Sequence, residues 1–349
     1  MDSMIARLTR HPAVVPIGAV VLAILIGAVI IIVAGLNPID AYAAVLQGSL
    51  DPRNLDYTFS VWGFICGMGL VAAIPLRMGE FNLGGNGQLV LGGVTAYVVA
   101  SQLGLPGIVA VPLALIAAML VSGGFAAVSA PLATRFGIPI IISTLLLSPV
   151  AVAVASYLVR FPLAEKGSGT AQTPVLPEDA HIWSLGDLRY TTVGLLLIIA
   201  VMVIFYVVDS RSAVGFELRV TGANRRFGEY AGLKPGRLAL GAMGSAGAVA
   251  GLVGAIIVLS SPYRFIDGAL ISPGYTFAGL AAALLAGGRP ALVPVTAILF
   301  TILQVGGASM ERTADVPRQL SDVLQGVVIV ILALRVVLDA RRAGAGKDS

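Results

Sequence analysis

Ten apolar runs, each long enough or nearly long enough to cross a membrane, alternate with polar segments along the chain. They cover residues 14–36, 57–77, 83–103, 107–134, 138–160, 191–208, 238–259, 274–288, 291–309 and 320–338. About 20 consecutive apolar residues form a helix that crosses the hydrocarbon core of a bilayer. The eighth run is short and the third is rich in glycine, so each is a candidate for a broken or re-entrant helix. The pattern predicts an all-α polytopic membrane protein with about ten transmembrane or re-entrant helices.

The composition agrees with this fold class. Hydrophobic residues make up 57% of the 349 residues and charged residues only 11%, whereas about a quarter of an ordinary soluble domain is charged. The net charge of +4 says little by itself, because in a membrane protein the sidedness of Lys and Arg carries the information. Nucleic-acid binding would need a solvated basic face, and we do not expect it. The single cysteine, Cys66, cannot form a disulfide within the chain.

The distribution of basic residues predicts the orientation. If the N-terminus is cytoplasmic and all ten runs span, 15 of the 22 Lys and Arg residues are cytoplasmic and seven are external, as the positive-inside rule favours. Both termini and the polar segment 209–237 are then cytoplasmic, and the loop 161–190 is external. That loop is too small to be a domain, so we expect one transmembrane domain over 1–349.

Two groups of four runs flank the sixth run and begin on opposite sides of the membrane in this topology. If the two groups share a fold, they are related by inversion, as in many transporters. No residue-by-residue repeat is visible between them, so the inverted four-helix repeat is a hypothesis only.

Glycines recur in the seventh run at helical spacing, at positions 241, 244, 247, 251 and 254. Steps of three and four residues place them on one smooth helix face. Such a face favours close helix packing, and the alternative is a flexible gating helix.

Catalytic and metal-binding patterns are missing from the sequence. The two histidines are His11 and His181, and the chain contains no HExxH motif and no GxSxG motif. The C-terminal GAGKDS lacks the first glycine and the final Ser or Thr of a phosphate-binding loop. We therefore expect no catalytic residue, no metal site and no cofactor, and any ATPase that drives this protein is another chain.

The polar stretch EFNLGGNGQ, residues 80–88, opens the third run and contains Asn82, Asn86 and Gln88 among three glycines. Lipid penalises such a stretch unless it faces protein or water. It is either an ordinary interfacial loop or a broken helix beside a permeation path, in which Phe81 and the three amides would contact the solute. Gln304 supplies a further amide in the ninth run.

Charged residues lie in loops or near the ends of the runs. An unpaired charge at the bilayer centre costs at least about 2.5 to 3.5 kcal/mol, so the path suits a neutral solute. An ion-coupled secondary transporter would want an intramembrane carboxylate, and a lipid-modifying enzyme would want a nucleophile and a base; neither is visible.

The segment 209–237 has six basic residues against three acids, and its pattern predicts a short helix over 216–230 that Gly232 and Pro235 close. This helix would lie along the membrane surface. Its exposed polar residues suit docking into a cleft of an ATPase, and a solvated loop is the alternative.

Several motifs together resemble the permease subunits of nucleoside-type ABC importers, in the superfamily of ribose and branched-chain amino acid permeases. FNLGGNGQ at 81–88 resembles a family box in the membrane, and RVTGANRRFGEYAGL at 219–233 resembles the cytoplasmic coupling segment. GSGTAQTPVLP at 167–177 resembles the external loop of the nucleoside branch. The likeness covers nearly the whole chain.

The resemblance implies a transmembrane permease subunit of an ATP-driven importer in the bacterial cytoplasmic membrane, for nucleosides or related small neutral polar solutes. A sugar such as ribose is the alternative substrate. The implied partners are a homologous second permease, a cytoplasmic ABC ATPase that holds ATP and Mg, and an extracytoplasmic substrate-binding lipoprotein. The expected coupling residues are Arg219, Gly222, Asn224, Arg225, Glu229 and Gly232, and the expected path residues are Phe81, Asn82, Asn86, Gln88 and Gln304.

Overall fold

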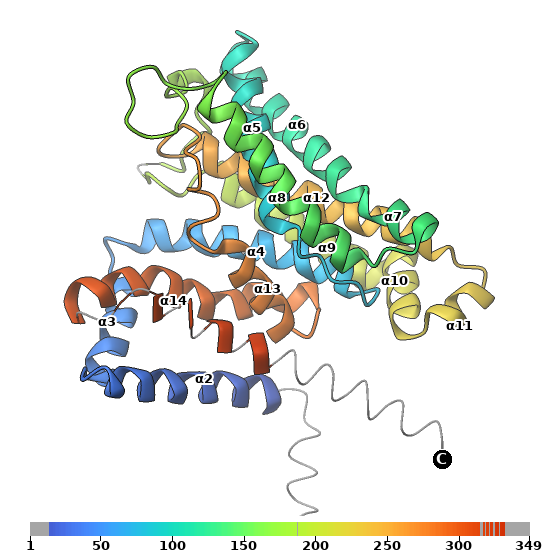
Figure 1. Cartoon of the computed structure of the whole chain (residues 1–349), viewed down its shortest axis with the longest axis horizontal. Coiled ribbons are helices and arrows are strands. Elements are labelled where there is room, and N and C mark those ends of the chain that lie inside the picture. Colours follow the sequence, from blue (N-terminus) through green and yellow to red (C-terminus); the bar gives the residue numbers. More distant parts are fainter. Residues whose placement is uncertain are drawn as a thin grey trace, which may run out of the picture. The chain divides into compact units, whose positions relative to one another are not determined.

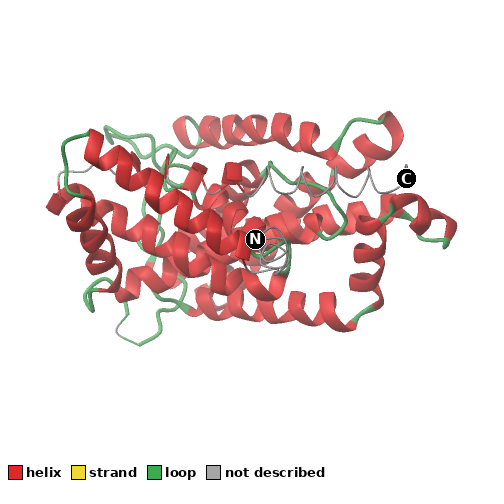
Figure 2. Cartoon of the chain, turned by 90° about the horizontal axis from the view of Figure 1, so that it is seen from below, coloured by secondary structure: helices red, strands yellow, loops and turns green. Residues whose placement is uncertain are grey.

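The computed structural model describes residues 14–314 except residue 187, together with residues 317, 319–320, 322–323, 325–327 and 329–331. Within these residues the regular elements are all helices joined by loops (Figure 2), as the apolar pattern predicted. The helices are α2 (Val14–Val33), α3 (Pro38–Leu50), α4 (Leu55–Leu76), α5 (Gly85–Gln102), α6 (Gly107–Ala127), α7 (Ser129–Phe136), α8 (Ile140–Arg160), α9 (Val193–Arg211), α10 (Ala213–Ala223), α11 (Arg225–Tyr230), α12 (Pro235–Leu259), α13 (Tyr275–Leu285) and α14 (Val293–Ala314), with short 3-10 turns at Glu178–Ala180 and Pro290–Leu292.

Six segments of the described chain are long and apolar enough to cross a membrane. They are Leu55–Leu76, Gly107–Phe136, Ile140–Arg160, Val193–Arg211, Pro235–Leu259 and Pro290–Thr313. Two shorter apolar helices, Val20–Val33 and Tyr275–Leu285, correspond to the first and eighth runs. The protein is therefore a multi-pass membrane protein. The total of about ten helices and the inverted repeat stay predictions, since residues 1–13 and most of the tenth run lie outside the described part.

One helix was not anticipated from hydropathy. Helix α3 (Pro38–Leu50) follows the first run directly, and five of its 13 residues are buried. Its start carries a local signal, because Asn37 accepts a hydrogen bond from Ile39 N at 2.9 Å and proline occupies the first helical position. Asparagine at the N-cap and proline at N1 are both favoured at a helix start. Because α3 contains both polar and apolar residues, the hydropathy pattern did not indicate it.

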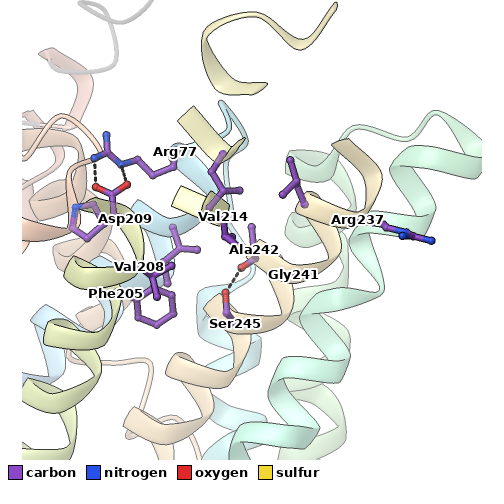
Figure 3. A pocket seen from close by; sticks show the side chains of 13 residues that line it. Arg77, Phe205, Val208, Asp209, Val214, Arg237, Gly241, Ala242 and Ser245 are labelled. Atoms are coloured by element: carbon purple, nitrogen blue, oxygen red, sulfur yellow. Dashed lines mark hydrogen bonds and ion pairs between the residues drawn. The ribbon is translucent and has the colours of Figure 1, made fainter. Parts of the chain in front are cut away.

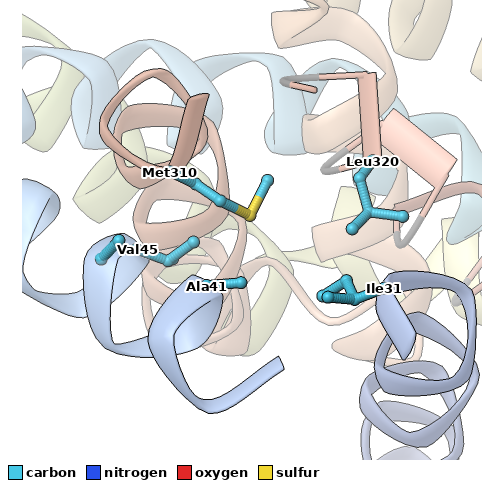
Figure 4. Close-up of a cluster of buried hydrophobic side chains, with 6 residues drawn as sticks. Ile31, Ala41, Val45, Met310 and Leu320 are labelled. Atoms are coloured by element: carbon cyan, nitrogen blue, oxygen red, sulfur yellow. The ribbon is translucent and has the colours of Figure 1, made fainter. Parts of the chain in front are cut away.

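The chain divides into two compact units, one of residues 1–58 with 298–349 and one of residues 59–297. In the first unit, α3 packs closely against α14 at glycine positions: a Cβ on Gly306 would collide with the Val45 main-chain oxygen, and a Cβ on Gly48 would collide with the Ser309 side chain. Met310, Ala41, Ile31 and other apolar side chains form the buried cluster beside this contact (Figure 4).

In the second unit, α12 packs along α5 and α6, and α8 packs against α5 (Figure 1). Gly247 and Gly251 of α12 lie against the α6 backbone, and Gly254 lies against the α5 backbone. A Cβ at any of the three would collide with a main-chain oxygen. Close packing, the first of the two interpretations of the glycine series, is confirmed for these three positions; Gly241 and Gly244 make no such contact.

Candidate functional site: the α10–α11 segment and the loop before α5

A mostly buried carboxylate joins the ends of three helices in the second unit. Asp209, in the last turn of α9, accepts hydrogen bonds from Arg77 Nε at 2.8 Å and from Arg77 Nη2 (Figure 3). Arg219 of α10 donates from Nη1 to the Asp209 main-chain oxygen and lies 3.3 Å from Oδ1. A carboxylate is disfavoured at a helix C-terminus, and here two arginines compensate it, one of them through two nitrogens. We call Arg77, Asp209 and Arg219 the Asp209 clamp.

The turn between α9 and α10 is fixed by local contacts. Ser212 is the only residue between the two helices; its Oγ donates to Val208 O at 2.6 Å and accepts from Gly215 N at 3.1 Å. A Cβ on Gly215 would lie only 2.6 Å from Asp209 O. The sequence therefore folds α10 back tightly enough to bring Arg219 onto Asp209.

Helix α10 then lies directly against the backbone that follows α4. A Cβ on Gly222 would collide with the Arg77 main-chain oxygen and would lie 3.0 Å from Met78 Cα. Only glycine permits this approach. Gly222, predicted as a coupling residue, is thus a contact point between α10 and the loop 77–84.

The prediction of one helix over 216–230 is wrong, because the structure has two, α10 and α11, which meet at Asn224. Asn224 has extended backbone angles and its Oδ1 accepts from Phe227 N at 3.0 Å, so it is the N-cap of α11. An N-cap residue has non-helical backbone angles, so the residue that begins α11 also ends α10. Gly232, with φ of 82°, follows α11 in the left-handed conformation that ends helices.

The α10–α11 segment presents an exposed face of basic and aromatic side chains. Tyr230 is 92% exposed, and Phe227 is 61% exposed. Arg225 and Glu229 form an exposed pair one turn apart at 3.5 Å. Exposed aromatics beside arginines are the composition that protein interfaces favour.

The loop 77–84 links this segment to α5. Gly79, with φ of 78°, closes α4, and Glu80 N donates to Pro75 O at 3.1 Å in the pattern of a Schellman cap. The Glu80 carboxylate lies 3.9 Å from Arg225 Nη1. Burial raises the pKa of Glu80, and the Arg225 charge opposes part of that rise. The predicted coupling residue Arg225 therefore reaches the first residue of the predicted path stretch.

Asn82 and Gln88 are brought together as a buried amide pair. Asn82 Nδ2 donates to Gln88 Oε1 at 3.0 Å, and Gln88 Nε2 donates to Asn82 Oδ1 at 3.1 Å. Asn82 Oδ1 also accepts from Gly84 N at 3.0 Å. Asn82 is 5% exposed and Gln88 1%. In this conformation the two amides satisfy each other and hold the start of α5.

Two neighbouring helices bind the same stretch. Ser148 Oγ of α8 accepts from Gly87 N at 3.0 Å, and Thr144 Oγ1 accepts from Leu83 N at 3.2 Å. Ser122 Oγ of α6 donates to the Gln88 main-chain oxygen at 2.8 Å. The start of α5 is thus bonded to α6 and α8, and a shift of the loop 77–84 would reach both.

The remaining predicted path residues are placed differently. Phe81 and Asn86 are half-buried and flank the amide pair in sequence. Gln304 belongs to the other unit, where its Oε1 lies 3.5 Å from Gln325 Nε2. The structure therefore gathers Phe81, Asn82, Asn86 and Gln88 at the start of α5.

Sequence reasoning missed the partners that come from distant positions. Arg77 was counted only as one of the cytoplasmic basic residues and Asp209 only as one of the three acids of the segment 209–237, and Thr144 and Ser122 were not singled out. The sequence signal for Asp209 is its position: an acid in the last turn of an apolar helix needs a nearby cation. The sequence does not say which of the neighbouring arginines that cation is.

Comparison with known proteins supports a transport role for this arrangement. The family model described as branched-chain amino acid transport system / permease component matches residues 54–333. The glucose ABC transporter permease protein TsgB13 of Haloferax volcanii is 30% identical over 347 residues, covering 95% of this chain and 90% of that protein. The nucleoside ABC transporter permease protein NupB of Lactococcus lactis is 27% identical, covering 93% and 92%.

The guanosine ABC transporter permease protein NupP of Bacillus subtilis is 28% identical, and the match covers 95% of each chain. The family match includes every described helix from α5 to α14, and with it the Asp209 clamp, the amide pair and the α10–α11 segment. The chain belongs to the family of ABC transporter permease components whose model spans its residues 54–333.

Proposed function

We propose that this chain is the transmembrane subunit of an ATP-driven importer and that its α10–α11 segment docks on the ATPase. The observation that supports this most directly is the form of the segment: two short helices that expose Phe227, Tyr230, Arg225 and Glu229 while Gly222 and Arg219 fasten them to the membrane helices. A surface that is exposed yet rigidly attached suits the transfer of force from a partner.

The expected partners follow from the permease family. They are a cytoplasmic ATPase that binds ATP and Mg, a homologous second permease and an extracytoplasmic substrate-binding lipoprotein. The proposed orientation places the segment 209–237 and both termini in the cytoplasm and the loop 161–190 outside, in a bacterial cytoplasmic membrane.

Docking is tested by the charge reversal Glu229→Arg. The Glu229 side chain is 54% exposed, so the substitution changes the surface and spares the buried contacts. We expect that a tagged complex purified from the host loses its ATPase chain, while the permease still accumulates. The matched control is Glu178→Arg, an exposed acid of the loop 161–190, which should retain the ATPase. Equal retention in both variants would remove the docking role.

For the solute we propose a nucleoside or a related small neutral polar molecule. Charged residues of the described spanning helices lie only near helix ends, such as Arg160 of α8 and Arg237 of α12, and a charged solute would lack compensation at the midplane. One relative is named for glucose and two for nucleosides. These solutes share hydroxyl groups and carry no net charge.

The half-buried Asn86 is the amide near α5 best placed for such a solute, because Asn82 and Gln88 already satisfy each other. Uptake of a labelled nucleoside by cells with the whole complex should be competed by other uncharged nucleosides and not by nucleotides or amino acids. Preferential competition by glucose would support the sugar alternative, and competition by a nucleotide would contradict the neutral-solute proposal.

A further inference from the structure

The Asp209 clamp connects α10 to α9 and to the end of α4. The carboxylate belongs to α9, Arg219 belongs to α10, and Arg77 is the residue that follows α4. Arg77 and Asp209 are 19% and 15% exposed, so solvent screens their ion pair only partly. Bidentate arginine pairing also fixes the relative orientation of the two side chains. The clamp therefore ties α10 rigidly to the end of α4.

The clamp is joined to the amide pair by a short, constrained piece of chain. Arg77 and Asn82 both belong to the loop 77–84, in which Gly79 N and Glu80 N are bonded back to α4. Farther along, Asn82 is bonded to Gln88, and Gly87 is bonded to Ser148. Hydrogen bonds therefore hold the loop at several points between Arg77 and the start of α5, and we expect a displacement of Arg77 to reach the amide pair.

A partly open apolar pocket of about 420 Å³ lies beside the clamp and is lined by residues of α4, α9, α10 and α12. Its lining includes Ile74, Phe205, Val208 and Leu238, with Arg77 and Asp209 at its edge (Figure 3). Close-packed interiors resist displacement, whereas an open space beside a helix lets that helix tilt without compressing a core. A Cβ on Gly241 would meet nothing within 4 Å, which shows that α12 leaves this space unfilled.

We propose that Asp209 is a positioning residue for transport: through its two arginines it passes movement of the α10–α11 segment to the loop 77–84 and so to the Asn82–Gln88 pair. The pocket beside the clamp supplies the room for that movement. The inference rests on the proposed function, because it assumes that an ATPase moves α10–α11. It differs from docking, since Asp209 lies behind the exposed face and need not touch the partner.

The test measures uptake and ATP hydrolysis on the same purified, reconstituted complex. Asp209→Asn keeps the shape of the side chain and removes its charge. We expect the complex to assemble and hydrolyse ATP while solute uptake per ATP falls about tenfold or more, the size of a typical coupling between sites. Glu165→Gln is the control, because Glu165 also pairs with an arginine, Arg264 at 2.9 Å, but lies in the loop between α8 and α9 and makes no ion pair with α10; it should leave the ratio unchanged.

Gly241→Leu provides an independent variant that leaves every ion pair intact and places a side chain in the pocket. It should also lower uptake per ATP, whereas Gly124→Leu, at another position where a Cβ meets nothing within 4 Å, should not. An unchanged ratio in both Asp209→Asn and Gly241→Leu overturns the proposal. Loss of the ATPase from the Asp209→Asn complex also overturns it, in favour of a docking role. A wild-type complex without ATP-dependent uptake would instead refute the proposed function itself.

Discussion

The α9–α10 corner and the loop 161–192, which joins α8 to α9, both use a partly buried carboxylate to hold a connection between helices, yet they distribute their bonds differently. At the corner, the ion pairs all involve one carboxylate, Asp209, which joins Arg77 and Arg219. The loop 161–192 is held by bonds to the end of α12 and to the segment after it: Leu176 N donates to Tyr263 O at 2.8 Å, and Ile182 N donates to Leu259 O at 2.9 Å.

Further contacts attach the loop and the end of α8 to the same segment. Arg264 pairs with Glu165 at 2.9 Å, and His181 stacks on Tyr263 with ring centroids 3.6 Å apart, while Asp267 accepts from Ser156 and Arg160 at the end of α8. Redundant bonds make a region insensitive to the loss of any one of them, whereas a single shared carboxylate makes a region that can be released. The difference agrees with our proposal that the corner transmits movement while the loop stays in place.

The largest expected effect comes from a side chain at Gly222. Gly222→Val forces a Cβ into the Arg77 main-chain oxygen, so α10 must move away from the loop 77–84, and close-packed contacts of this kind do not yield without loss of stability. We expect strongly reduced accumulation of the protein and no assembled complex on size-exclusion chromatography. Gly169→Val, in open space within the loop 161–192, should behave as the wild type. Normal assembly of Gly222→Val would show that the contact is dispensable.

The second effect compares the stability lost when the Asp209 carboxylate and the Asp267 carboxylate are each removed. Asp209→Asn leaves Arg77 without its charged partner, while Arg219 keeps its bond to the main-chain oxygen of residue 209. Because the Arg77 pair is mostly buried, we expect a loss of about 2 kcal/mol, below the cost of breaking a fully buried pair. Asp267→Asn should cost less than about 1 kcal/mol, since the Arg160 side chain is 57% exposed. Thermal unfolding in detergent measures both. A larger loss for Asp267→Asn would reverse the comparison of the corner with the loop.

The smallest effect concerns Glu80 at the edge of the corner. Burial raises the pKa of this carboxyl in the folded protein, so the folded state holds the proton more tightly than the unfolded state. The contribution of Glu80 to stability is then favourable at acidic pH and is lost as the pH rises through the folded-state pKa.

Glu80→Gln removes this titration. The melting temperature of the variant should equal or slightly exceed that of the wild type at neutral pH. The difference in melting temperature should shrink as the pH is lowered toward the range in which carboxyl groups take up a proton. The Arg225 pair, at 3.9 Å and with Arg225 56% exposed, is too weak to reverse this sign. Destabilisation by Glu80→Gln at neutral pH would mean that the pair outweighs the burial cost.

Hydropathy predicted the membrane helices because their burial in lipid depends on local composition. It failed for α3, whose mixed polarity reflects packing within the protein, and for the break at Asn224, where a capping side chain overrode a continuous helical pattern. The α10–α11 segment was located correctly as a whole, since a cluster of basic residues between apolar runs is visible in one dimension.

The contacts of the site were less accessible to sequence reasoning. The contact of Asn82 and Gln88 with solute stays a prediction, and their pairing with each other was not foreseen. Asp209 meets Arg77 across 132 positions of sequence, and no local pattern specifies that meeting. Residue types were therefore predictable, and long-range partners were not.

The most direct test of the account places a single cysteine at Tyr230, which is 92% exposed, in a Cys66→Ala background. A short thiol-directed cross-linker should join position 230 to the ATPase chain, and an impermeant thiol reagent should not reach it from outside intact cells. A cysteine at Lys166, exposed in the loop 161–192, should show the opposite behaviour. Labelling of position 230 from outside, or the absence of an ATPase cross-link in an assembled complex, would contradict the central claim that α10–α11 is where ATP hydrolysis acts on this permease.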